Sequence, residues 1–237
     1  MSPVSFSLDP SALVWTGVIF VTYLAALRLR QIFPRSVWAS PIITTSAVVA
    51  LVALIAAAPL DTLDAGGSVW MALLVPATMA MAIPLYDHRH LLKQHARAIM
   101  PALIIGSVSA VASALGVALL LGAAQPSLLA LAPKSVTTPI AVGIGLETNA
   151  PIGLVACLVI VTGLIGIILG PLLFRRLKWH NDDAAQGLAY GLAAHAIGTA
   201  EAWQKSSRMG SFAALALGVN GLLTGLILPT LLAWLFP

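Results

Sequence analysis

Eight apolar segments, separated by short polar stretches, decide which folds this 237-residue chain can adopt. A helix needs about 20 apolar residues to cross a bilayer, and the segments are close to that length. Only 8% of the residues are charged, whereas soluble domains carry about a quarter. The sequence therefore predicts an all-α integral membrane protein, a polytopic helical bundle in one transmembrane domain, residues 1–237. The segments are Ala12–Leu27, Pro41–Ala58, Val69–Tyr86, Ile99–Leu121, Leu128–Leu146, Ile152–Phe174, Ala184–Trp203 and Phe212–Leu235.

We interpret the third, fifth and seventh segments as broken or re-entrant, because of the helix breakers that they contain. Proline removes a backbone donor and clashes with the preceding turn, and glycine weakens a helix. The second, fourth, sixth and eighth segments are uninterrupted or nearly so. The breakers are Pro76 and Pro84 in the third segment, Pro133 and Pro139 in the fifth, and Gly187, Gly191 and Gly198 in the seventh.

The order of a clean span, a broken segment, a polar loop and a long helix occurs twice along the chain. We therefore expect two repeat-like halves, at residues 12–122 and 128–236. Interrupted segments at corresponding positions of two halves are typical of a transporter's binding site. The alternative is that proline and glycine are simply common in membrane helices.

The loop charges test the topology, because short basic loops face the cytoplasm. Eight simple crossings would place the basic stretch Arg175–Lys178 on the outside. A re-entrant Leu128–Leu146 removes this conflict, so we expect a multi-pass protein of the cytoplasmic (inner) membrane with its N-terminus outside. On this interpretation the basic residues set the topology, and no nucleic-acid partner is expected. The loop charges are Arg28, Arg30 and Arg35, then Asp61 and Asp64, then Arg89, Lys93 and Arg97, then Arg175, Arg176 and Lys178.

Lys134 is the most costly charge in the sequence, because it lies between two prolines in the apolar stretch LAPKSVTTPIA. A charge at bilayer depth needs a partner or a wet pocket. An ammonium beside Ser135, Thr137 and Thr138 can attract an anion, and Pro139 helps to unwind the backbone. The alternative is that Lys134 reaches water at the membrane surface.

A second group of polar residues lies in GLAYGLAAHAIGTAEAW, Gly187–Trp203. Every fourth residue is small or polar, which on one helix would form a single stripe that includes His195 and Thr199. His195 can donate, accept or carry a proton near neutral pH. Gly198, beside Thr199, is the expected break. Glu201 would pair with Lys134 or lie at the interface.

Three further residues are weaker candidates. Asn220 places an amide inside the last span, either as a contact between helices or as a substrate contact. Pro76 and Thr78 lie where a broken helix would expose backbone. The expected site is therefore asymmetric, with its charged groups in the second half.

The sequence contains no HExxH, GxSxG or Walker motif, so we expect no enzyme activity. The histidines of DHRHLLKQH lack the cysteine or acidic partners of a metal site, and no metal is expected. Without a Walker loop, transport would be secondary or would use another subunit's ATPase. No cofactor is expected, and a coupling proton or sodium ion is left open.

Four stretches in series resemble the LrgB/CidB family of bacterial inner-membrane proteins. They are PATMAMAIPLY, LAPKSVTTPIA, GLAYGLAAHAIGTAEAW and ALALGVNGLLTGLILP. The resemblance covers roughly Asp64 to the C-terminus, and the segment up to Asp61 is similar in hydropathy only. The family often has SHGIGTA around its histidine, whereas this chain has AAHAIGTA with Ala194 and Ala196.

The resemblance implies two functions. One is antiholin-like control of murein hydrolase export and autolysis with a small LrgA/CidA-type, holin-like partner. The other is transport of small carboxylates, since plastid members carry glycolate and glycerate and some bacterial pairs are associated with pyruvate. The residues favour a secondary carrier for a small monocarboxylate anion in the lipid bilayer. Lys134, Ser135, Thr137 and Thr138 would bind the carboxylate and His195 and Thr199 would face it, in a homo-oligomer that we expect to be a dimer.

Overall fold

The computed structural model describes residues 10–33, 36–80, 82–87, 89–179 and 181–236. Within this part of the chain the regular structure is helical, without a strand. Four of the described helices are long and apolar enough to cross a membrane. The prediction of an all-α, multi-pass membrane protein is therefore confirmed. These helices are α1 (Pro10–Ile32), α5 (Arg89–Leu120), α8 (Ile152–Arg176) and α11 (Ser207–Leu235).

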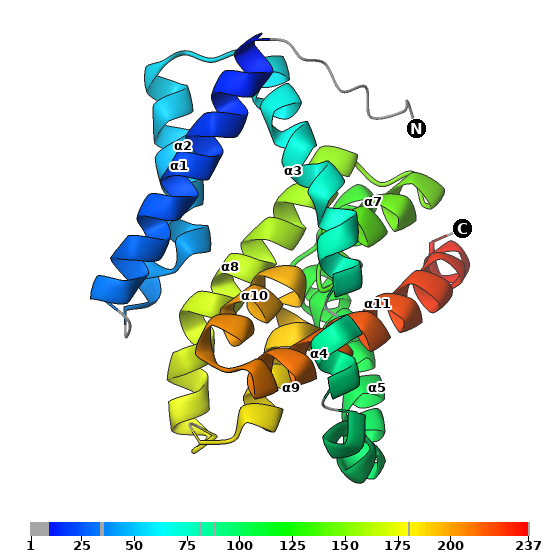
Figure 1. Cartoon of the computed structure of the whole chain (residues 1–237). Helices are drawn as coiled ribbons and strands as arrows, with labels where there is room; N and C mark the ends of the chain where they lie inside the picture. The colour runs from blue at the N-terminus through cyan, green and yellow to red at the C-terminus, as the bar shows by residue number, and fades with distance from the viewer. Residues whose placement is uncertain (1–9, 34–35, 81, 88, 180, 237) are drawn as a thin grey trace. The chain divides into compact units, whose positions relative to one another are not determined.

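The chain divides into two compact units, residues 1–83 and 84–237. In the first unit, α1 packs against α2 (Pro41–Ile55) and α3 (Leu60–Ala80), with the short helix η1 (Val37–Ala39) before α2 (Figure 1). Helices α1 and α3 meet at Gly66, where a side chain would collide with Trp15. Helix α2 is uninterrupted, as expected, but its 15 residues are fewer than a full span needs.

The third apolar segment differs from the expectation at Pro76. Helix α3 continues through this proline as far as Ala80, so Pro76 does not break it. Membrane helices tolerate proline where neighbouring groups satisfy the freed carbonyl. A separate helix, α4 (Ala82–Asp87), follows Met81, which lies outside the described residues.

The second unit is built on α5, α8 and α11. Helices α5 and α11 run in the same direction, because their early residues Ile99 and Phe212 share one buried cluster. Their late residues Leu115 and Leu232 share another. Helix α8 runs the opposite way, since its early residue Val155 belongs to that second cluster. We call the end of the unit at which α5 and α11 begin the start end, and the end at which these two helices terminate the finish end.

The fifth apolar segment forms a re-entrant hairpin, as the loop charges and prolines predicted. Helix α6 (Gln125–Leu131) stops just before Pro133, and α7 (Thr138–Glu147) has Pro139 in its first turn. With 7 and 10 residues, neither helix is long enough to cross a bilayer. Gln125 and Glu147 line one pocket together with Phe236. The chain therefore enters and leaves this first hairpin at the finish end.

The seventh segment is also broken, but not where expected. Helix α9 (Asp183–Ala193) and helix α10 (His195–Lys205) are separated at Ala194, so the expected break at Gly198 is wrong. The two outer ends of this second hairpin meet, because Ser206 Oγ donates to Asp183 Oδ2 at 2.9 Å. Ser206 also caps α11 by accepting from the backbone N–H of Met209. The second hairpin therefore enters from the start end, between α8 and α11 (Figure 1).

The two hairpins explain the distribution of charge in the second unit. The start end carries Arg97 at the beginning of α5 and Arg175 and Arg176 at the end of α8. Among the charged residues described between 84 and 237, the finish end carries Glu147 alone. The first hairpin returns to the side from which it enters. The basic loop with Arg97 and the basic loop with Arg175 and Arg176 therefore lie at the same end, which removes the conflict that eight simple crossings would cause.

Candidate functional site

Lys134 lies at the tip of the first hairpin, in the turn between α6 and α7. Its side chain is half-buried, and Nζ donates to the hydroxyl of Ser135 at 3.1 Å. Among the described residues, no carboxylate lies within ion-pair distance of this ammonium. A cation deep in a membrane protein without an acidic partner is typical of a site for an anion.

The depth of this tip is given by Asn220, which lies near the middle of α11. Its Nδ2 donates to the backbone carbonyl of Ser135 at 2.8 Å. Asn220 is only 2% exposed, and its Oδ1 accepts from the hydroxyl of Thr224 at 3.4 Å. The tip of the first hairpin therefore reaches the middle of a membrane-spanning helix.

His195 lies at the tip of the second hairpin and is 2% exposed. Its Nε2 is 2.9 Å from the carbonyl oxygen of Val159 on α8. A carbonyl can only accept, so Nε2 carries the hydrogen in this contact. Gly163, one turn further along α8, leaves room for the ring, because a Cβ there would lie 2.9 Å from Cε1. The backbone of His195 has φ +41°, which few non-glycine residues adopt.

The two tips meet at Asn220, whose Nδ2 lies 2.8 Å from the carbonyl oxygen of Ser135, next to Lys134, and 3.4 Å from that of Leu192, three residues before His195. Thr137 and Thr138 begin α7 four residues or fewer from Lys134, and neither hydroxyl caps the helix. The amide hydrogens in a helix's first turn lack intrahelical acceptors and favour an anion.

Other predicted residues have structural partners. The Thr199 hydroxyl donates to the carbonyl of His195 at 2.8 Å, within its own helix. A side chain at Gly198 would lie 2.5 Å from the carbonyl of Tyr190, so this glycine lets the hairpin arms approach. Pro139 is exposed in the first turn of α7. The side chains of Pro76 and Thr78 lie outside the described residues.

Glu201 is the clearest correction. It is 3% exposed and lies 3.9 Å from Lys205 one turn along α10, so it pairs with this lysine rather than with Lys134. Lys205 also donates to the hydroxyl of Tyr190 at 2.7 Å. The i, i+4 spacing explains the pair, because such residues share one helix face.

The stripe expected along Gly187–Trp203 does not form, because the helix breaks in its middle. Gly187 and Gly191 face α11, where side chains on them would collide with the backbone of Met209 and Ala213. His195 faces α8 instead. The small residues do allow close helix approach, as predicted.

Three contributors to the site were not expected from the sequence. They are the carbonyls of Val159 and Leu192 and the space left by Gly163. Backbone acceptors leave no sequence signal. The spacing of Gly163, Gly166 and Gly170 on α8 does give one, since these residues share a helix face and all contact the second hairpin.

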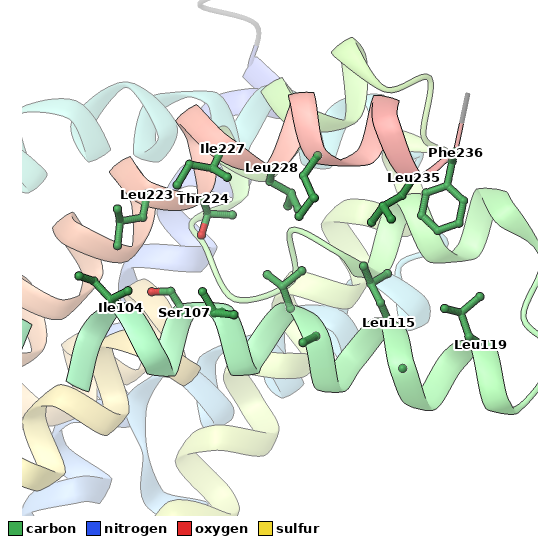
Figure 2. A pocket seen from close by; sticks show the side chains of 15 residues that line it. Ile104, Ser107, Leu115, Leu119, Leu223, Thr224, Ile227, Leu228, Leu235 and Phe236 are labelled. Carbon is green, nitrogen blue, oxygen red and sulfur yellow. The ribbon is translucent and has the colours of Figure 1, made fainter. Parts of the chain in front are cut away.

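A separate groove of about 550 Å³ lies between α5 and α11 and does not include Lys134 or His195 (Figure 2). Its lining is apolar except for Ser107 and Thr224, and the buried Ser107 hydroxyl has no partner among the described residues. Thr224 connects the groove to Asn220. Among the described residues, no group of His, Cys, Asp or Glu side chains could hold a metal ion.

Comparison with known proteins extends the resemblance to most of the chain. YwbG of Bacillus subtilis, an uncharacterised protein, is 33% identical over 91% of this chain and 95% of its own length. The holin-like protein CidB of Staphylococcus aureus is 28% identical over 93% of this chain and 96% of its own. No solved structure matches. The LrgB-like family model matches residues 19–234, including the N-terminal part that resembled the family in hydropathy only, so this chain belongs to the LrgB-like family.

Proposed function

We propose that the protein carries a small monocarboxylate across the membrane. The observation that supports this most is Lys134, a cation without an acidic partner among the described residues, at the tip of a re-entrant hairpin that Asn220 contacts in the middle of α11. Broken helices that meet near mid-membrane are the usual site architecture of secondary transporters. A carboxylate would compensate the ammonium and accept hydrogen bonds from Ser135 and the first turn of α7.

Glycolate, glycerate and pyruvate are the substrates to test, since the family resemblance implies them. The protein is reconstituted in liposomes, and uptake of each labelled acid is measured against concentration. We expect saturable uptake by the wild type and on the order of a hundredfold less by Lys134→Ala, because a buried charge-assisted contact is lost.

The matched control is Lys93→Ala, which removes an exposed lysine near the start of α5. Both variants remove one positive charge, so they have the same net charge. Lys93→Ala should nevertheless transport like the wild type. Absence of uptake for all three acids, with wild type equal to Lys134→Ala, would refute the carrier. Uptake that does not saturate would indicate a channel instead.

The second candidate is a regulatory role in cell lysis, with a small holin-like partner. The similarity to CidB of Staphylococcus aureus, a holin-like protein, supports this candidate. An effect on autolysis could follow from carboxylate flux, in which case the two functions are one. Lysis is measured in cells that express Lys134→Ala: a regulator without transport predicts an unchanged phenotype and a co-purifying small membrane protein.

A further inference from the structure

We infer that Asn220 is a positioning residue whose single amide group holds the tips of both hairpins together and thereby sets the positions of Lys134 and His195. This inference rests on the proposed function only for its consequence in transport, since the contacts stand by themselves. Asn220 lies on α11, outside both hairpins.

The contacts involve one nitrogen atom and two acceptors. Nδ2 of Asn220 donates to the carbonyl of Ser135 at 2.8 Å and to the carbonyl of Leu192 at 3.4 Å. An amide nitrogen has two hydrogens, so both bonds can exist at once. Ser135 belongs to the hairpin from the finish end and Leu192 to the hairpin from the start end.

Both contacts lie next to the proposed binding groups. The hydroxyl of Ser135 accepts from Lys134, so the residue that Asn220 holds by its backbone also holds the cation by its side chain. Leu192 lies on the last turn of α9, directly before the break at Ala194 and His195. Asn220 therefore controls the position of the ammonium from one side and of the imidazole turn from the other.

The opposite directions of the hairpins give this amide a further role. A tip that leaves Asn220 can open a path only from its own end of the unit. With both bonds formed, both tips are held at Asn220. When one tip leaves, the N–H of Asn220 that it released remains at the site as a donor. A carboxylate, which only accepts, can then accept a hydrogen bond from this N–H.

Ordinary adhesion between helices is the competing explanation for a buried asparagine. It predicts lower stability when the amide is lost, without a coordinated change at the two tips. The positioning role predicts that both tips become reachable together, each from its own side of the membrane.

The test uses reporter cysteines in full-length protein in membranes, after the chain's single cysteine, Cys157, has been replaced by serine (Cys157→Ser). Val136→Cys reports the first tip and Leu192→Cys the second, and both replace a larger side chain with a smaller one. A membrane-impermeant maleimide is applied from each side. Asn220→Asp has almost the same shape but lacks both donors, so labelling of both reporters should rise on the order of tenfold, the effect of one hydrogen bond on an opening equilibrium.

Thr224→Val is the matched control. It removes the hydroxyl that donates to Oδ1 of Asn220 and leaves both donors in place, so labelling should stay within about twofold of the parent. Asn220→Gln keeps two donors and moves them by one methylene, so its labelling should fall between the two. This variant also serves if Asn220→Asp does not fold.

Unchanged labelling in both Asn220 variants, or a rise at one tip only, would overturn the inference. The assay contains no substrate, so its outcome is independent of the proposed transport. Coordinated labelling without any carboxylate uptake would refute the carrier and keep the positioning role. Saturable uptake without a change in labelling would do the reverse.

Discussion

At the scale of single residues, the site depends on the backbone conformation of His195 as well as on charge. His195 occupies the left-handed region, with φ +41°, and begins α10. This conformation turns the chain between the hairpin arms and places the ring against α8. The strain of such a residue is on the order of 1 kcal/mol and persists only where surrounding packing imposes it.

Substitution of His195 should separate its backbone role from its imidazole. Asparagine tolerates the left-handed region, whereas a β-branched residue does not. We expect His195→Val to melt several degrees below His195→Asn, since roughly 1–2 kcal/mol of added strain shifts the melting temperature by that amount. Thermal unfolding of the detergent-purified variants measures the difference, and equal melting temperatures would contradict the strained turn.

The residues differ in how well the sequence predicted them. Lys134 was predictable, because a charged side chain inside an apolar segment costs free energy unless it has a partner or a wet pocket. Asn220 was a weaker candidate from the sequence, because nothing near a lone amide in a membrane span indicates which residue it will bind. That partner, Ser135, is 85 positions away in the chain, and only the folded structure brings the two together.

At the scale of elements, the second hairpin depends on close approach to α11. Gly191 lies so near the backbone of Ala213 that an added Cβ would overlap its carbonyl oxygen. A backbone atom cannot rotate away as a side-chain end can. The packing of α9 on α11 therefore requires a glycine at this position.

Alanine substitutions test this packing with a control on the partner helix. Gly191→Ala should destabilise the protein by about 1–3 kcal/mol, because it overpacks a backbone contact. Gly218→Ala, on α11, meets nothing within 4 Å and should be neutral or stabilising by up to about 1 kcal/mol through helix propensity. Chemical denaturation in detergent compares the two, and a neutral Gly191→Ala would show that the helices are further apart.

Element boundaries were predictable where proline marks them. Pro133 and Pro139 set the end of α6 and the start of α7 through local chemistry. The break between α9 and α10 lies at Ala194 and His195, which carry no breaker signal. That break comes from tertiary packing, since Ala194 fits against Gly166 and the ring fits beside Gly163.

At the scale of the whole molecule, charge separates the two ends of the second unit. The start end carries the arginines of α8 and the beginning of α11, and the positive-inside rule places such an end in the cytoplasm. Arg208→Cys should thus react with an impermeant maleimide only after cells are permeabilised. Labelling of Arg208→Cys in intact cells would reverse this orientation.

Several properties of the whole molecule remain predictions. The repeat halves at 12–122 and 128–236, the dimer, and the coupling proton or sodium ion depend on symmetry, partners and ions. A hydropathy pattern records the order of spans, whereas these properties depend on surfaces between chains and on states that one conformation does not contain.

Sided labelling of four exposed positions tests the two opposed hairpins most directly. Gln125→Cys and Glu147→Cys flank the first hairpin, and Asn181→Cys and Gln204→Cys flank the second, each in a Cys157→Ser background. With an impermeant maleimide, the first two should react from one side of the membrane and the last two from the other. If Gln125→Cys and Glu147→Cys react from opposite sides, α6 and α7 form a crossing rather than a hairpin, and the account of the site fails.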